Sequence, residues 1–134
     1  MNWTKAVIAG VVGGVAVWIA NFIMHAVIMG QTYAKYPEVF SQEEGSPFPF
    51  LLVGVFIAVP GALLFAKTRD SWGEGIAGGA TFGFWLGLVS FFAPFYNSLV
   101  LEGFPYFLAW CWGGINLIGF VILGAILGAM VKKA

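Results

Sequence analysis

The sequence predicts an all-α integral membrane protein, a bundle of four transmembrane helices with both termini cytoplasmic. Three observations lead to this prediction: 60% of the 134 residues are hydrophobic, only 9% are charged, and the apolar residues form four long segments. A mean hydropathy of +0.92 is too high for a chain that must cover its surface with polar groups. Backbone amides cannot stay unpaired in lipid, and barrel-type alternation is missing, so each segment is expected to be helical.

The four predicted helices form a single membrane domain, residues 1–134. Each segment has roughly 17 to 27 residues, enough to cross a hydrocarbon core of about 30 Å at about 1.5 Å per residue. No small-residue cleavage site follows the first segment, which is therefore expected to be a retained helix rather than a signal peptide. The predicted helices cover residues 6–29, 50–66, 75–101 and 106–131. Pro60 and Pro94 interrupt the hydrogen bonding of the second and third of them and free one carbonyl each, which is expected to kink the helix or to expose backbone oxygen to a ligand.

Basic residues set the expected orientation, because positively charged loops stay in the cytoplasm. The side that holds both termini carries five of the six basic residues: Lys5, Lys67, Arg69, Lys132 and Lys133. The other side carries Lys35 with the acids Glu38, Glu43, Glu44 and Glu102. A multi-pass protein of the inner (plasma) membrane is expected. The net charge of zero offers no basic field for nucleic acid.

The longest predicted connection, residues 30–49, lies on the extracytoplasmic side and contains three prolines that prevent a long helix. Its aromatic residues Tyr33, Tyr36 and Phe40 can anchor the loop at the membrane surface, as aromatic belts do. Alternatively, the loop covers a cavity between the helices.

Glycines at every fourth position are the strongest local pattern in the chain. The third predicted helix carries Gly75, Gly79, Gly83 and Gly87 on one face, a glycine zipper that lets two helix backbones approach closely. Similar pairs occur on the first and fourth helices, at Gly10 and Gly14 and at Gly124 and Gly128. These faces can pack within one chain or between subunits.

A stripe on the first helix holds the only histidine. Gly10, Gly14, Trp18, Asn21 and His25 lie within about 80° of arc at about 100° per residue, so the stripe faces protein. Asn21 is placed to fix the tautomer of His25. His25 is either interhelical hydrogen-bonding glue or part of a ligand or proton-relay site.

Further polar side chains come from the outer halves of the third and fourth helices, including Asn97 and Asn116. A shallow outward pocket would make Trp18, Asn21, His25, Asn97 and Asn116 ligand-binding candidates for a quinone, a lipid or haem. Alternatively, these residues satisfy helix ends at the interface.

Catalytic and metal chemistries find little support. One histidine and one distant cysteine, Cys111, do not supply the ligands that zinc or non-haem iron requires. Haem would have to rely on His25, because Met24 and Met29 lie on the same helix. No nucleophile and base set or phosphate-binding motif is present, so no catalytic residue, metal site or required cofactor is predicted.

Trp18, Asn21, His25 and the turn with Met29, Gly30 and Tyr33, followed by a glycine-rich third helix, resemble small uncharacterised bacterial inner-membrane proteins. The resemblance implies a four-helix bundle and no activity. The leading hypothesis is an accessory or scaffold subunit that packs through its glycine faces against other membrane subunits or a second copy of itself. The alternative is a binding or transport protein for an apolar or amphipathic ligand near His25.

Overall fold

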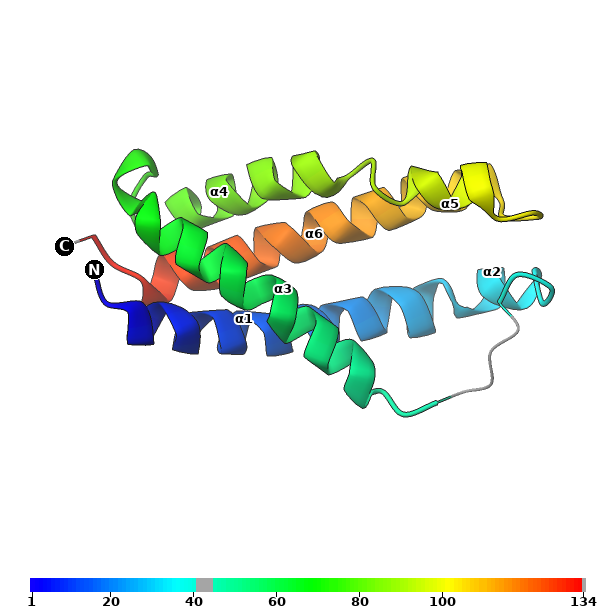
Figure 1. The fold of residues 1–134 in the computed structure, drawn as a ribbon, viewed down its shortest axis with the longest axis horizontal. Helices are drawn as coiled ribbons and strands as arrows, with labels where there is room; N and C mark the ends of the chain where they lie inside the picture. The colour runs from blue at the N-terminus through cyan, green and yellow to red at the C-terminus, as the bar shows by residue number, and fades with distance from the viewer. Residues whose placement is uncertain (41–44, 134) are drawn as a thin grey trace.

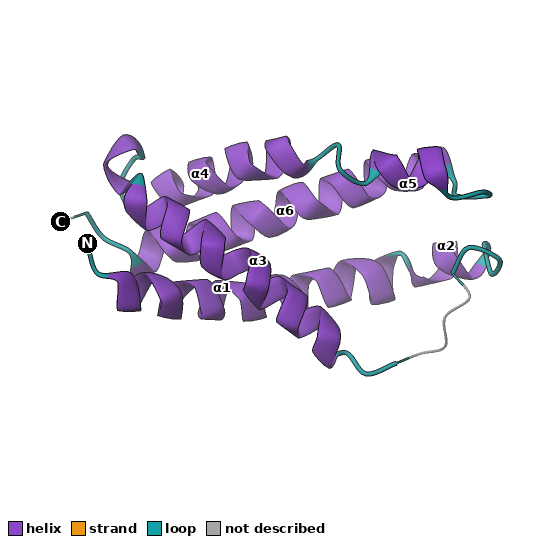
Figure 2. Ribbon diagram, viewed as in Figure 1, coloured by secondary structure: helices purple, strands orange, loops and turns teal. Residues whose placement is uncertain are grey.

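The computed structural model describes residues 1–40 and 45–133 and is helical throughout this part of the chain (Figures 1 and 2). Four helices are long and apolar enough to cross a membrane: Trp3–Ile28, Phe48–Lys67, Gly75–Val100 and Tyr106–Met130. The prediction of an all-α chain with four candidate spans is therefore confirmed. The predicted positions of Glu43 and Glu44 lie outside the described residues.

The first span consists of two kinds of helix. Helix α1 covers Trp3–Phe22, and its N-cap is Asn2, whose side-chain oxygen accepts the Lys5 backbone N–H at 3.0 Å. It continues as a π-helix, η1, at Ile23–Ile28, followed by the short helix α2 at Gly30–Ala34. The predicted loop therefore begins with a helical turn.

The two prolines behave differently. Helix α3 covers Phe48–Lys67 and runs through Pro60 without a break, and a kink at Pro60 stays a prediction. Pro60 lies on the exposed side of α3. The third span does divide: α4 ends at Ser90 and α5, Phe95–Val100, begins directly after Pro94. The predicted third helix, residues 75–101, is therefore interrupted at Pro94 as expected, and it consists of two helices joined by turns.

Helix α6, Tyr106–Met130, is the central element of the bundle. It packs along α4 on one side and against α1 on another, while α1 also packs along α3. Figure 1 shows both termini at one end of the bundle, here called the termini end. Helices α2 and α5 lie at the opposite end, here called the loop end. The polypeptide therefore crosses the bundle four times.

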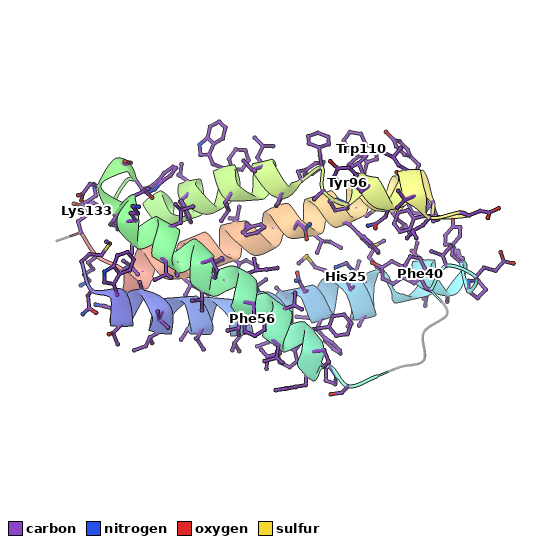
Figure 3. The ribbon with its side chains drawn as sticks, viewed as in Figure 1. His25, Phe40, Phe56, Tyr96, Trp110 and Lys133 are labelled. Carbon is purple, nitrogen blue, oxygen red and sulfur yellow. The ribbon has the colours of Figure 1, made fainter. Side chains whose placement is uncertain are left out.

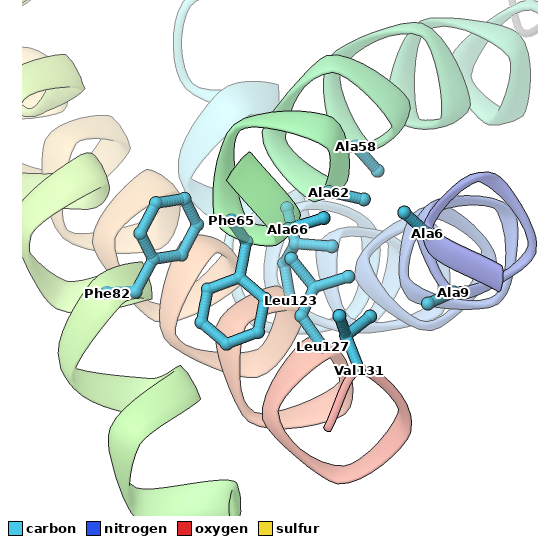
Figure 4. Packing of buried hydrophobic residues seen from close by; sticks show 10 residues of the cluster. All are labelled: Ala6, Ala9, Ala58, Ala62, Phe65, Ala66, Phe82, Leu123, Leu127 and Val131. Carbon is cyan, nitrogen blue, oxygen red and sulfur yellow. The ribbon is translucent and has the colours of Figure 1, made fainter. Parts of the chain in front are cut away.

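The main core lies at the termini end, where α1, α3, α4 and α6 meet (Figure 4). Small residues of α1 and α3 pack against larger side chains, and the Phe65 and Phe82 rings contact each other in a tilted arrangement with centroids 5.0 Å apart. The buried cluster consists of Ala6, Ala9, Ala58, Ala62, Phe65, Ala66, Phe82, Leu123, Leu127 and Val131. A second, smaller core at the loop end is built on Phe104, Leu108 and Ala109.

A buried arginine closes the termini end. Arg69, in the 3₁₀ turn η2 at Arg69–Ser71, is only 6% exposed. Its Nε donates to the Val131 carbonyl at 2.7 Å, and its Nη1 donates to the Gly73 carbonyl at 2.9 Å. The guanidinium carbon lies 5.1 Å from the centre of the Phe65 ring. The charge is thus held by carbonyls and an aromatic face, and it joins the α3–α4 connection to the end of α6.

Candidate functional site

A hydrogen-bonded network lies at the loop end between α1, α2 and α6. The Tyr33 hydroxyl is 2.6 Å from His25 Nδ1, and Trp112 Nε1 donates to the same hydroxyl at 2.7 Å. We call these three side chains the hydroxyl network. Both hydrogen bonds can form together when the Tyr33 hydroxyl donates its hydrogen to His25 Nδ1 and the imidazole carries its hydrogen on Nε2.

Aromatic rings surround the hydroxyl network. The Tyr33 and Phe40 ring centroids are 4.8 Å apart, and those of Phe104 and Trp112 are 5.2 Å apart. Burial raises the pKa of the Tyr33 hydroxyl from its ordinary value of 10.0, against the Trp112 hydrogen bond, which lowers it. Tyr33 therefore stays neutral at physiological pH. Figure 3 labels His25 and Phe40 at this end of the bundle.

The same end of the bundle holds the described part of the loop after α1. Tyr33 and Phe40 pack on the core at Phe104, Leu108 and Ala109. Tyr36 lies against Phe107 at 6.2 Å between ring centroids. The described part of the loop thus packs on the loop end of the helices, and both its anchoring at the membrane surface and its covering of a cavity stay predictions.

A cavity of about 320 Å³ lies between η1 and the first half of α6. We call it the α1–α6 cavity. Its wall is apolar apart from sulfur: Met24, Ile28, Met29, Trp110, Cys111, Gly114, Ile115 and Ile118. Ile118 is 50% and Trp110 48% exposed, so the cavity is open on its lipid side.

The depth of the cavity follows from its position along the helices. Met29 comes directly after the first candidate span, and Cys111 is the sixth residue of the last one. At about 1.5 Å per residue, the sulfur of Cys111 is attached only about 8 Å from the start of its helix. The cavity therefore lies close to the membrane boundary, within reach of the interface.

Asn21 does not fix the His25 tautomer as predicted, because Tyr33 bonds to Nδ1 instead. The side-chain oxygen of Asn21 is buried and has no hydrogen-bond partner within the described residues. It faces α6 at Gly119, where a Cβ on that glycine would lie 3.6 Å from it. An unpaired buried carbonyl typically costs about 1–3 kcal/mol, so Asn21 weakens the seam between α1 and α6.

The other predicted ligand-binding residues lie apart from the network. Trp18 lines a hollow of about 250 Å³ with Ile19, Phe22 and Pro47, on the α3 side of α1. Asn97, in α5, and Asn116, in α6, are half-buried. No side-chain hydrogen bond joins either of them to His25 in the part of the chain that the structure describes. The structure thus does not bring the five candidates into one pocket.

The predicted glycine positions lie mostly where helices approach closely. A Cβ on Gly79 would lie 2.6 Å from the Gly128 Cα, and one on Gly83 would lie 2.8 Å from the Phe120 carbonyl carbon. Gly87 packs on Leu117 of α6, and Gly124 contacts the carbonyl of Gly79. These close approaches join α4 and α6 of the same chain.

The remaining glycines of the pattern fall into two groups. On α1, a Cβ on Gly10 would lie 2.9 Å from the Val59 Cα and one on Gly14 would lie 2.8 Å from the Val55 Cα, both on α3. Gly75 differs, because a Cβ there would meet open space. Its φ of +62° is a left-handed conformation that favours glycine at the start of α4.

Sequence reasoning missed the residues that complete the site. The sequence pattern offers Tyr33 as a surface anchor or as part of a cavity cover, and it does not single out Trp112. The sequence could have identified Trp112, because Trp110 and Trp112 flank Cys111 at a spacing of two residues. Side chains two apart point about 160° away from each other on a helix, so one of the two tryptophans must face inward.

Within the described residues no three His, Cys, Asp or Glu side chains cluster as a metal site would require. Thioethers fall outside that set, and two of them line the α1–α6 cavity. The chain matches no protein-family model, no curated protein and no solved structure. Functional inference therefore depends on the network and the cavity.

Proposed function

We propose that this chain is a membrane binding or transport protein whose ligand occupies the α1–α6 cavity. The observation that carries the proposal is that this cavity opens toward lipid and that its wall residue Met29 packs on the same core as Tyr33 and Trp112 of the hydroxyl network. Pockets of about 300–1,000 Å³ with apolar walls and a few polar groups are typical ligand sites. At about 320 Å³ the cavity favours a small ligand, or one end of a longer apolar or amphipathic molecule.

The π-helix η1 supports a site rather than a plain span. The π-helical hydrogen-bond pattern is rare, and it occurs mostly where function retains it. Here it includes His25 and Met24, and it ends where Met29 begins the turn into α2. The change of helix type thus coincides with the network and the cavity.

An accessory subunit remains our second proposal. The glycine faces are filled by helices of the same chain, so a partner would have to pack on surfaces that now face lipid. Large side chains on α4 and α5 offer such a surface: Val89 is 83% and Leu99 79% exposed. A neighbouring subunit that covers them would gain dispersion contacts.

We also propose that the termini end is cytoplasmic. Four exposed lysines gather there, Lys5, Lys67, Lys132 and Lys133, and positively charged segments stay inside. The α1–α6 cavity then lies near the outer surface of the inner membrane.

Native mass spectrometry of protein extracted gently from its own membrane tests the proposal. We expect a small bound mass on the wild type and on Tyr96→Phe, whose exposed hydroxyl lies outside the network. Tyr33→Phe removes the hydroxyl that both His25 and Trp112 contact, and should reduce the bound fraction. Stoichiometric partner subunits without any small ligand would overturn this proposal in favour of the accessory subunit.

A further inference from the structure

Sulfur is concentrated in the wall of the α1–α6 cavity. The whole chain contains four methionines and one cysteine. Three of these five side chains, Met24, Met29 and Cys111, are among the eight residues that line this one cavity. Such a concentration points to a ligand that prefers sulfur.

The π-helix places the two methionines on the same wall. Residues five apart in an α-helix point about 140° away from each other, at about 100° per residue. In η1 the helix is wider, and the Met29 backbone N–H bonds to the Met24 carbonyl at 3.1 Å, five residues back. Both methionines line the cavity, and Cys111 of α6 lines it too.

We propose that the α1–α6 cavity binds a soft monovalent metal ion, Cu(I), through the sulfurs of Met24, Met29 and Cys111. This inference depends on the proposed function and names its ligand. Thioether and thiolate ligands select Cu(I) over harder ions, and the wall of this one cavity supplies three such sulfurs. A metal binds the thiolate form, so each ion bound displaces the Cys111 proton to solvent.

Charge explains why the ion is monovalent. An uncompensated charge is costly in an apolar wall. One Cu(I) and one thiolate sum to zero, whereas Zn(II) with the same ligands would leave one positive charge. The wall includes no carboxylate or imidazole that could neutralise or coordinate a harder ion. The site therefore discriminates by both softness and charge.

The test is anaerobic titration of the purified full chain, free of any affinity tag, with Cu(I) in competition with a chromophoric Cu(I) chelator. We expect one Cu(I) per chain in the wild type. Cys111→Ser, Met24→Leu and Met29→Leu should each lower the affinity about tenfold or more, because even an outer-shell change costs about 10–100-fold. Met130→Leu is the matched control, since Met130 packs on the core at the termini end. X-ray absorption of the loaded protein should show a first shell of sulfur alone.

The outcomes separate this inference from the proposed function. Absence of Cu(I) binding would overturn the copper site. Wild-type affinity for Cu(I) in Cys111→Ser and in both methionine variants would overturn it as well. If native mass spectrometry then still finds an organic molecule whose binding needs Tyr33, the proposed function stands without copper. If neither ligand binds, both proposals fail. Each variant's fluorescence spectrum, compared with Met130→Leu, establishes that it is folded.

Discussion

The contact between α4 and α6 at Gly83 can be tested with a single methyl group. In Gly83→Ala the new Cβ would lie 2.8 Å from the Phe120 carbonyl carbon and 3.0 Å from the Val121 Cα. The Phe120 carbonyl oxygen would lie closer still, and ordinary van der Waals contact begins at 3.4 Å, so α4 and α6 must separate by about 1 Å or more. Such a gap loses a quarter to a half of each dispersion contact along the seam, and overpacking typically costs about 1–3 kcal/mol.

The matched control is Gly114→Ala on α6, where a Cβ would meet nothing within 4 Å. Both variants gain the same intrinsic helix propensity, up to about 1 kcal/mol, so their difference isolates the packing cost. We expect Gly83→Ala to be less stable than Gly114→Ala by about 1–3 kcal/mol. Reversible unfolding in mixed micelles titrated with dodecyl sulfate, followed by tryptophan fluorescence, measures this difference. Equal stability would refute the close contact, as would Gly83→Leu folding normally.

Three further predictions use the same protein. Arg69→Met should lower the free energy of unfolding by about 1–3 kcal/mol, because buried carbonyls lose their donor; Arg69→Lys should recover only part of it in the same micelle assay. The neutral Tyr33 hydroxyl should contribute fully to the free energy of unfolding below pH 10.0, and this contribution should be lost as pH rises through its raised pKa. Unfolding titrations should therefore show this alkaline loss of stability in the wild type but not in Tyr33→Phe. The orientation can be measured with single cysteines on a Cys111→Ser background and a maleimide that does not cross the membrane. Ser46→Cys should be labelled in intact cells, whereas Asp70→Cys should be labelled only after permeabilisation. The reverse pattern would contradict cytoplasmic termini.

The spans could be predicted from sequence because lipid leaves a segment of about 20 apolar residues few alternatives to a helix. Which of the two prolines ends a helix could not be predicted. A proline interrupts a helix only if no neighbouring group or distortion accommodates the lost hydrogen bond. Pro60 lies on the exposed side of α3, which continues, whereas Pro94 is buried and α4 ends before it. Sequence pattern alone does not distinguish these two situations.

The hydrogen-bond partner of His25 could not be predicted from the sequence for a different reason. Helical periodicity relates residues on one helix, so it placed Asn21 beside His25. The π-helix alters that periodicity within η1, and the actual partner, Tyr33, comes from beyond the next turn. The same irregularity brings Met24 and Met29 to one wall, which a regular helix pattern would place apart. The functional candidates therefore lie where the regular pattern ends.

The buried Arg69 has a consequence for the order in which the bundle forms. Its strongest acceptor, the Val131 carbonyl, lies 62 residues further along the chain. At about 5–20 residues per second of synthesis, that acceptor emerges roughly 3 to 12 s after the arginine. Until α6 is inserted, the guanidinium has to remain hydrated at the membrane surface. The α3–α4 connection is thus held at the interface during biogenesis, and the termini end can close only as the final step.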